Sequence, residues 1–206
     1  MLEQFYEKDK IELGIDEAGR GCLFGPVCVG AVIWLNEDPD PLLEIKDSKK
    51  VSDKNKTILR DYIVDNCIAY SIQLIHHEEI DKYNILQSTI NCMHKCLDEI
   101  TDIIDLDTIL VDGNHFDFYS DKNDNYIDHV CVIDGDNTYK SIAAASILAK
   151  TYRDDWINKL VDDNPELEKY DLRNNKGYGT KKHLDAIKKY GITEWHRKSF
   201  GICKSM

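Results

Sequence analysis

Two adjacent carboxylates, Asp16 and Glu17, follow a short apolar run and directly precede the tripeptide Gly19-Arg20-Gly21. Neighbouring side chains on a strand point to opposite faces, so we expect the strand to end here, with Asp16 directed into a cleft. Glycines lack a Cβ atom, which allows a positive φ and a close approach by a substrate backbone. A polar connection between strands would explain part of this string but not all of it. The pattern therefore predicts a site for a metal ion and a phosphate.

Two more acids follow apolar runs. Asp112 ends the run 108–112, and Asp136 comes shortly after the run 126–133. Strands of an α/β sheet often deliver site residues to one edge, and crowded carboxylates repel one another unless a divalent cation neutralises them. Oxygen ligands favour Mg²⁺ or Mn²⁺ over zinc, and two such ions suit phosphodiester hydrolysis. A single Asp at a strand end is usually a turn former, whereas three such positions in one chain leave a functional site and a set of turns as equal alternatives.

The elements that must position these acids alternate between strand and helix. The apolar pattern predicts strands at 11–16, 26–35, 67–76, 108–112 and 126–133. Helices are predicted at 53–66, from 79 onward with a break near Asn84, and from 141 onward, where alanines allow close packing on a sheet. The Asp- and Asn-rich stretch 116–126 is predicted to be a loop. The fold class is α/β, a mixed sheet with flanking helices.

Composition limits the classes of protein. The 206 residues contain no linker-like stretch, so we expect one domain over 1–206, in which 166–206 forms a helical segment. No apolar stretch is long enough to span a bilayer, and the start resembles no signal peptide, so no membrane role is expected. The seven cysteines, an odd number without Cys-x-x-Cys spacing, indicate reduced thiols in the cytoplasm. We expect Cys92 and Cys96 to pack in the core rather than to bind zinc.

The net charge of −12 argues against a nucleic-acid partner until its distribution is considered. The segment from Lys176 onward is basic, and a second basic cluster comprises Lys46, Lys49, Lys50, Lys54 and Lys56. Basic strips beside an acidic centre suit an enzyme that grips phosphates at its rim and holds cations in the middle. Individual lysines such as Lys188 and Lys189 are expected only to solvate a helix.

Several motifs together resemble the ribonuclease HII family, the type 2 ribonucleases H. They are Gly14-Ile-Asp-Glu-Ala-Gly-Arg-Gly21, Asp47-Ser-Lys-Lys50, Val111-Asp-Gly-Asn114, Gly135-Asp136, Ser141-Ile-Ala-Ala-Ala-Ser-Ile-Leu-Ala-Lys150 and Gly177-Tyr-Gly-Thr180. They occur in the family's order over most of the chain. The resemblance implies a ribonuclease H-like fold with a C-terminal helical segment. It also implies an endonuclease that cuts RNA paired to DNA, including single ribonucleotides embedded in DNA.

The resemblance also implies roles for individual residues. The metal-binding and catalytic acids are Asp16, Glu17, Asp112 and Asp136, with Mg²⁺ or Mn²⁺ as cofactor and two ions when substrate is bound. The backbone of Gly19, Arg20 and Gly21 would recognise the 2′-hydroxyl, the group that distinguishes RNA from DNA. The Tyr178 ring would lie on the sugar at the junction with the next deoxynucleotide. Lys49, Ser146 and Lys150 are candidate phosphate contacts, although Ser146 equally suits a helix–sheet contact.

Two departures from the family pattern stand near the site. Asp134 occupies a position where the family commonly has lysine, and the stretch 115–125 is acidic. The sister type, ribonuclease HIII, is disfavoured by the Gly-Arg-Gly loop and by Asp136, where that type has a glutamate. A resolvase or exonuclease of the same fold, and a non-catalytic binding module, remain as alternatives.

The expected partners are an RNA/DNA hybrid and duplex DNA that contains ribonucleotides, bound by a monomer. The short end Lys204-Ser-Met206 contains no clamp-binding tail, so a sliding-clamp partner is not expected. The composition rich in Ile, Asn, Asp and Lys indicates an AT-rich genome, bacterial or viral.

Overall fold

A mixed sheet runs through the centre of the protein, whose computed structural model describes residues 2–34 and 53–206. Within these residues the sheet has six strands in the order β3-β2-β1-β4-β6-β5. The strands are β1 (Glu12–Ala18), β2 (Val27–Ile33), β3 (Ala69–Ile75), β4 (Thr108–Asp112), β5 (Tyr119–Ser120) and β6 (Tyr126–Val132). β1, β4 and β6 are parallel neighbours, while β2, β3 and β5 pair antiparallel. The carboxyl ends of β1, β4 and β6 therefore meet at one edge.

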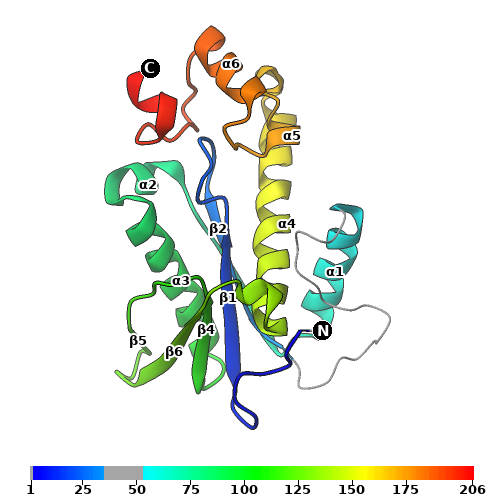
Figure 1. Cartoon of the computed structure of the whole chain (residues 1–206), viewed down its shortest axis with the longest axis vertical. Helices are drawn as coiled ribbons and strands as arrows, with labels where there is room; N and C mark the ends of the chain where they lie inside the picture. Colours follow the sequence, from blue (N-terminus) through cyan, green and yellow to red (C-terminus); the bar gives the residue numbers. More distant parts are fainter. Residues whose placement is uncertain (1, 35–52) are drawn as a thin grey trace.

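Helices cover both faces of this sheet (Figure 1). The α-helices are α1 (Asp53–Asn66), α2 (His77–Tyr83), α3 (Ile85–Thr101), α4 (Lys140–Asp163), α5 (Leu172–Asn175) and α6 (Lys181–Tyr190). Short 3₁₀ turns are η2 (Gly135–Asn137), η3 (Pro165–Tyr170) and η4 (Gly201–Ser205). One hydrophobic cluster joins α3 to one sheet face, and a second joins α1 and α4 to the other. The C-terminal elements pack around the far end of α4.

α4 lies unusually close to β1. A Cβ atom added to Gly14 would lie 2.3 Å from the backbone of Ser141 and Ile142, so no larger residue fits there. Ala143, Ala144 and Ala145 on α4 are fully buried. The predicted close contact between the alanine-rich helix and the sheet is confirmed, and it brings later residues of α4 next to the end of β1.

Most of the predicted elements are confirmed, with two corrections. Asn84 separates α2 from α3, with φ at 72° and its side chain accepting a hydrogen bond from Gln87 N. The stretch 116–126 is not only a loop, because it contains the two-residue strand β5, which hydrogen-bonds to β6 and buries Tyr119. β1 does not end at Asp16 but continues to Ala18, since Glu17 and Ala18 still pair with β2.

Cys92 and Cys96 are buried in the core, as expected, and all seven cysteines of the chain are free. No helix among the described residues is both long enough and apolar enough to cross a membrane.

Candidate functional site

The four predicted acids converge at the edge where β1, β4 and β6 end. Asp16 and Glu17 lie near the carboxyl end of β1, where they pair with Gly30 and Val29 of β2. Asp112 is the last residue of β4, and Asp136 lies in η2, directly after β6. The parallel register of these strands is what brings together residues that are 120 positions apart in the chain at most.

One cavity of about 270 Å³ contacts all four acids. Its lining comprises Asp16, Glu17, Ala18, Lys56, Asp112, Asp136, Ser146, Lys150 and Tyr178. A second cavity of about 250 Å³ shares Glu17 and Asp112 with the first, and is completed by Arg20 and residues of α3 and of 113–115. The acidic edge therefore opens on both faces of the sheet, with Asp16 facing the α4 side.

The environment of Asp16 disfavours the negative charge of its carboxylate. It is 6% exposed, and its pKa is raised well above the ordinary value by burial and by the neighbouring charges of Glu17 and Asp112. Hydrogen bonds from the Ser146 hydroxyl and the Glu17 N–H oppose this rise. Burial also raises the pKa of Glu17, while Arg20 lowers it. Negative charge is thus concentrated where little water can screen it, which is the environment that a bound cation relieves.

In this conformation the acids are turned toward local hydrogen-bond donors. Asp112 Oδ1 accepts hydrogen bonds from the backbone N–H groups of Gly135 and Asp136, and Glu17 Oε1 lies 3.1 Å from Arg20 Nη1. No three His, Cys, Asp or Glu side chains of the described residues are arranged to hold an ion as they stand. The donor set is nevertheless all oxygen and lines one cavity, so it fits a hard divalent cation after side-chain rotation.

Four predicted residues outside the acids and the Gly-Arg-Gly loop remain. Ser146 is buried and hydrogen-bonds to Asp16, so it serves the carboxylate as well as the helix–sheet contact. Lys150 Nζ lies 2.7 Å from Asp154 and also lines the cavity. Tyr178 is 43% exposed, and its pKa is raised by burial and by the nearby thiol of Cys22, which itself donates to the Lys176 carbonyl. Lys49 lies outside the described residues.

The Gly-Arg-Gly loop has different requirements at its two glycines. Gly19 has φ at 90°, and a Cβ atom there would lie 2.0 Å from Nε of Arg153, so this position needs glycine for structural reasons. Gly21 does not have a positive φ, and the nearest atom to an added Cβ would belong to the Tyr178 ring, 3.9 Å away. Gly21 is therefore the open glycine, next to Tyr178 on the exposed side of the loop.

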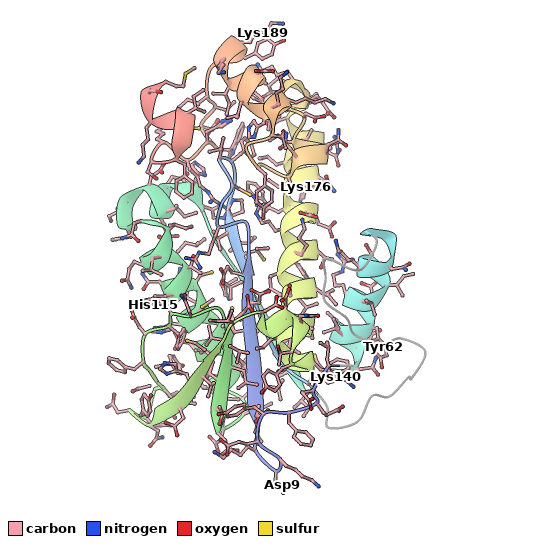
Figure 2. The ribbon with its side chains drawn as sticks, viewed as in Figure 1. Asp9, Tyr62, His115, Lys140, Lys176 and Lys189 are labelled. Atoms are coloured by element: carbon pink, nitrogen blue, oxygen red, sulfur yellow. The ribbon has the colours of Figure 1, made fainter. Side chains whose placement is uncertain are left out.

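Lys56 was not predicted as a cavity residue, and no sequence pattern predicted the two buried arginines, Arg153 and Arg197, beneath the loop. Lys56 belonged to a recognised basic cluster, which was the available signal. The arginines carried no comparable signal, because their partners are backbone carbonyls. Lys188 and Lys189 are exposed, as expected, and Lys189 lies at the far tip of α6 (Figure 2).

The departures from the family pattern have local structural roles. Asp134 is exposed and adopts the left-handed conformation with φ at 58°, and its carbonyl accepts a hydrogen bond from the Thr138 hydroxyl. In the acidic stretch, Asp121 binds the backbone N–H groups of Asn123 and Asn125. Both aspartates thus form turns, and neither lines the cavity of the four acids.

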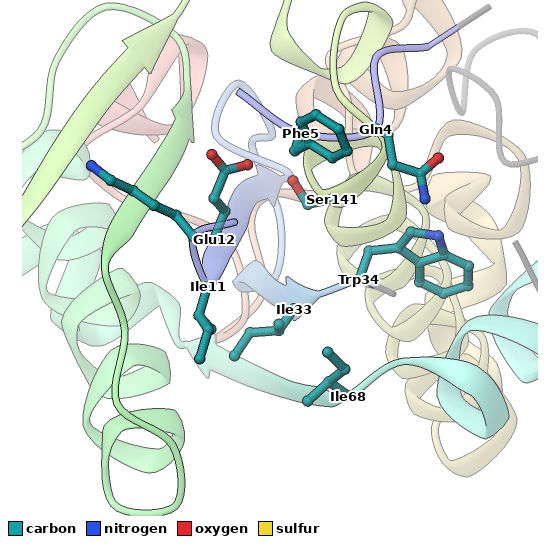
Figure 3. A pocket seen from close by; sticks show the side chains of 9 residues that line it. Gln4, Phe5, Ile11, Glu12, Ile33, Trp34, Ile68 and Ser141 are labelled. Carbon is teal, nitrogen blue, oxygen red and sulfur yellow. The ribbon is translucent and has the colours of Figure 1, made fainter. Parts of the chain in front are cut away.

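A further cavity, of about 70 Å³, lies at the opposite end of β1 and belongs to a different environment (Figure 3). Ile33, Trp34 and Ile68 form much of its wall, together with Gln4, Phe5, Lys10, Ile11, Glu12 and Ser141. Glu12 is its single acid. The cavity contains no cluster of carboxylates and is not the candidate site.

The fold and the acidic edge define a ribonuclease H-like hydrolase. A family model described as "Ribonuclease HII" matches residues 13–203. A relative named Ribonuclease HII from Christiangramia forsetii is 46% identical over 198 residues, which cover 96% of this chain and 94% of the relative. The chain belongs to the ribonuclease HII family. It is therefore an endoribonuclease that hydrolyses the RNA strand of RNA/DNA hybrids and cuts at ribonucleotides in duplex DNA.

Solved structures agree with the fold. The ribonuclease H2 from Pyrococcus horikoshii OT3 has a TM-score of 0.71 at 23% identity, covering 94% of this chain and 95% of that one. A Bst-RNase HIII solved in complex with Mn²⁺ has a TM-score of 0.72 at 18% identity, covering 94% of this chain and 68% of that one. The family match confirms the prediction of type HII over type HIII. The enzyme depends on a divalent metal ion.

Proposed function

We propose that Asp16, Glu17, Asp112 and Asp136 are the metal ligands and catalytic residues of this ribonuclease HII. The observation that carries the proposal is the single cavity lined by all four carboxylates, in which burial and mutual repulsion raise the pKa of Asp16. Mg²⁺ or Mn²⁺ fits this oxygen-only donor set, and the Mn²⁺ complex of the structurally similar Bst-RNase HIII supports the same choice. Two such ions would activate a water molecule and stabilise the leaving oxygen.

The residues around the acids would bind and orient the substrate. Gly21 exposes its backbone next to Tyr178, so a ribose whose 2′-hydroxyl meets the loop would also contact the tyrosine ring. Lys150 and Lys56 line the same cavity and would contact phosphates, and Lys49 is a further candidate. Ser146 would keep Asp16 oriented. The cut would fall 5′ of the ribonucleotide and leave a 3′-hydroxyl and a 5′-phosphate.

The segment 166–206 would act as the substrate-contact part of a single-domain monomer over 1–206. Tyr178 belongs to this segment and lines the acid cavity, which supports a direct role in binding. We place the enzyme in the cytoplasm, a location supported by seven free cysteines and by the bacterial ribonuclease HII relatives. Duplex DNA that contains ribonucleotides and RNA/DNA hybrids would be its partners.

The test uses three labelled duplexes: DNA with one ribonucleotide, all-DNA, and a long RNA/DNA hybrid, each with Mg²⁺, Mn²⁺ or a chelator. A metal-dependent cut 5′ of the lone ribonucleotide, with the all-DNA duplex intact, is the expected result. Cutting of plain DNA would favour a resolvase-like enzyme instead. Cutting of the long hybrid alone would remove the junction role of Tyr178, and no cutting with any metal would favour a binding module.

Asp136→Asn tests the one acid of the four that lies outside the strands. The substitution removes a ligand charge but almost no volume, so we expect most turnover to be lost while the fold persists. Near-normal activity with an unchanged circular dichroism spectrum would remove Asp136 from the site.

A further inference from the structure

Two buried arginines lie beneath the Gly-Arg-Gly loop, although the proposed chemistry does not use them. Arg153 is 1% exposed and Arg197 is 0% exposed. Neither forms an ion pair with a carboxylate among the described residues; both bind backbone carbonyls instead. Burying a guanidinium is costly unless its donors are satisfied, and Nη2 of Arg197 has no hydrogen-bond partner in the described part of the chain, so this buried pair needs an explanation.

The bonds of Arg197 lead directly to the loop. Its Nη1 donates to the carbonyl of Arg20 at 2.9 Å, and its Nε donates to the carbonyl of Gly25 at 2.9 Å. Burial lowers the pKa of this guanidinium to about 10, so it remains charged at neutral pH. Its own backbone N–H donates to Leu23 O, and Asp81 accepts from the N–H groups of Lys198 and Ser199. The backbone that carries the Arg197 side chain is thus held as well.

Arg153 fastens the other part of the loop and the segment that carries Tyr178. Its Nε donates to Pro26 O at 2.8 Å, its Nη2 to Phe24 O at 3.1 Å and its Nη1 to Lys176 O at 2.8 Å. Lys176 precedes Tyr178 by two residues, and Leu23 N donates to Gly177 O. One guanidinium therefore joins the strand–loop connection to the tyrosine segment.

The Arg197 contact also fixes the orientation of the peptide group between Arg20 and Gly21. A trans peptide is planar, so its N–H points opposite to its C=O. Arg197 holds the Arg20 carbonyl on the buried side, and the Gly21 N–H therefore points to the exposed side. That N–H has no hydrogen-bond partner within the described residues. It is a donor on the exposed side of the loop, in a glycine whose added Cβ atom would lie 3.9 Å from the Tyr178 ring.

We propose that Arg197 and Arg153 are positioning residues that determine ribonucleotide selectivity, because they orient the Gly21 N–H and lock it to Tyr178. The inference rests on the proposed function, in which this loop recognises the 2′-hydroxyl. We expect lysine to be a poor replacement for either residue, because its compact ammonium lacks the planar fork with which a guanidinium reaches carbonyls on separate segments.

The experiment compares Arg197→Lys with Arg173→Lys. Arg173 lies on the same C-terminal segment but pairs with Asp162 and Glu168 at the surface, so its variant is a matched control. We measure single-turnover cleavage of the one-ribonucleotide duplex, and separately the affinity for the all-DNA duplex. For Arg197→Lys we expect cleavage to fall at least about tenfold while DNA affinity changes less than about twofold. A loss of folded protein would lower both in proportion, and an unchanged cleavage rate would overturn the proposal.

A spectroscopic measurement separates this inference from the proposed function. The ¹⁵N and ¹H resonances of the Gly21 amide should shift in Arg197→Lys and stay unchanged in Arg173→Lys. If wild-type protein cuts no ribonucleotide, the proposed function fails, whatever the spectrum shows. If wild-type protein cuts and the variant keeps both its rate and its Gly21 resonance, only the inference fails.

A second variant and one measurement on unmodified protein cover the case in which Arg197→Lys does not fold. Arg153→Lys should reduce cleavage relative to DNA affinity in the same direction but by less, since it contacts Phe24 and Pro26 rather than Arg20. In wild-type protein, scalar coupling across the hydrogen bond between the Arg197 guanidinium nitrogen and the Arg20 carbonyl carbon should be detectable. Its absence, with rapid exchange of the guanidinium protons, would overturn the proposal.

Discussion

Glu12 and Asp16 lie four residues apart on β1 and are almost equally buried, at 8% and 6% exposure. The Glu12 carboxylate accepts hydrogen bonds from the backbone N–H groups of Tyr6 and Glu7 (Figure 3 shows its surroundings). Asp16 also has donors, but it faces the carboxylates of Glu17 and Asp112. A buried acid is thus structural where backbone donors enclose it, and becomes a candidate for chemistry where other acids crowd it.

The largest expected effect separates these two acids by activity. Asp16→Asn should reduce turnover on the order of 10³-fold, about 4 kcal/mol of transition-state stabilisation, because it removes a carboxylate that we propose as a metal ligand. Glu12→Gln should keep turnover within about twofold. Steady-state cleavage of the one-ribonucleotide duplex checks both. Comparable losses in the two variants would contradict the distinction.

Metal binding should separate the acids by stability. A cation that binds only the folded state at 100 times its Kd stabilises it by about 2.7 kcal/mol. We expect Mn²⁺ to raise the Tm of wild-type protein and of Glu12→Gln, and to leave that of Asp16→Asn almost unchanged. Differential scanning calorimetry with and without Mn²⁺ measures this. An equal rise in all three proteins would mean that the ion binds elsewhere.

Removing the structural acid should affect the fold alone. Glu12→Ala leaves the N–H groups of Tyr6 and Glu7 without their acceptor, at a cost of about 1–3 kcal/mol in the free energy of unfolding. Urea unfolding measures the loss. Wild-type stability in this variant would show that water replaces the carboxylate at no cost.

The last prediction concerns a buried histidine pair that stays neutral, and it lies away from both acids. Thr193 N–H donates to Nδ1 of His196, so the proton of His196 is on Nε2 and is donated to Nε2 of His183, 3.2 Å away. His183 Nδ1–H donates in turn to the carbonyl of Tyr178. Burial, followed by the neighbouring His183, lowers the pKa of His196 from 6.5 to about 3.

The lowered pKa of His196 determines how the free energy of unfolding changes with pH. The unfolded state binds the proton first, so the stabilising contribution is complete above about pH 6.5 and is lost as the pH falls toward 3. We expect a contribution to the slope of about 1.4 kcal/mol per pH unit in this window. Urea unfolding from pH 4 to 7 should give a shallower slope for His196→Gln than for wild type, with His115→Gln, at an exposed histidine, as control. Identical slopes would contradict the assignment.

Local patterns made much of the fold and the acids predictable. Asp112 and Asp136 follow apolar runs that form strands in any α/β protein, and Gly14 and the alanines of α4 mark the closest helix–sheet contact. β5 escaped prediction because a two-residue strand amid Asp and Asn carries no periodicity. Arg153 and Arg197 escaped it because backbone carbonyls, which every residue has, leave no sequence signal for a partner.

The large sequence separation between Arg197 and its partner Arg20 has a consequence for folding during synthesis. Its bond to Arg20 spans 177 residues, and the parallel pairing of β1 with β4 joins Glu12 to Thr108. Contacts so distant in sequence form slowly and require almost the whole chain. A nascent chain in which Arg197 is still inside the ribosome lacks the hydrogen bond that supports the Gly-Arg-Gly loop. We expect selective cleavage to appear only after synthesis of the C-terminal segment, as the last property that the growing chain acquires.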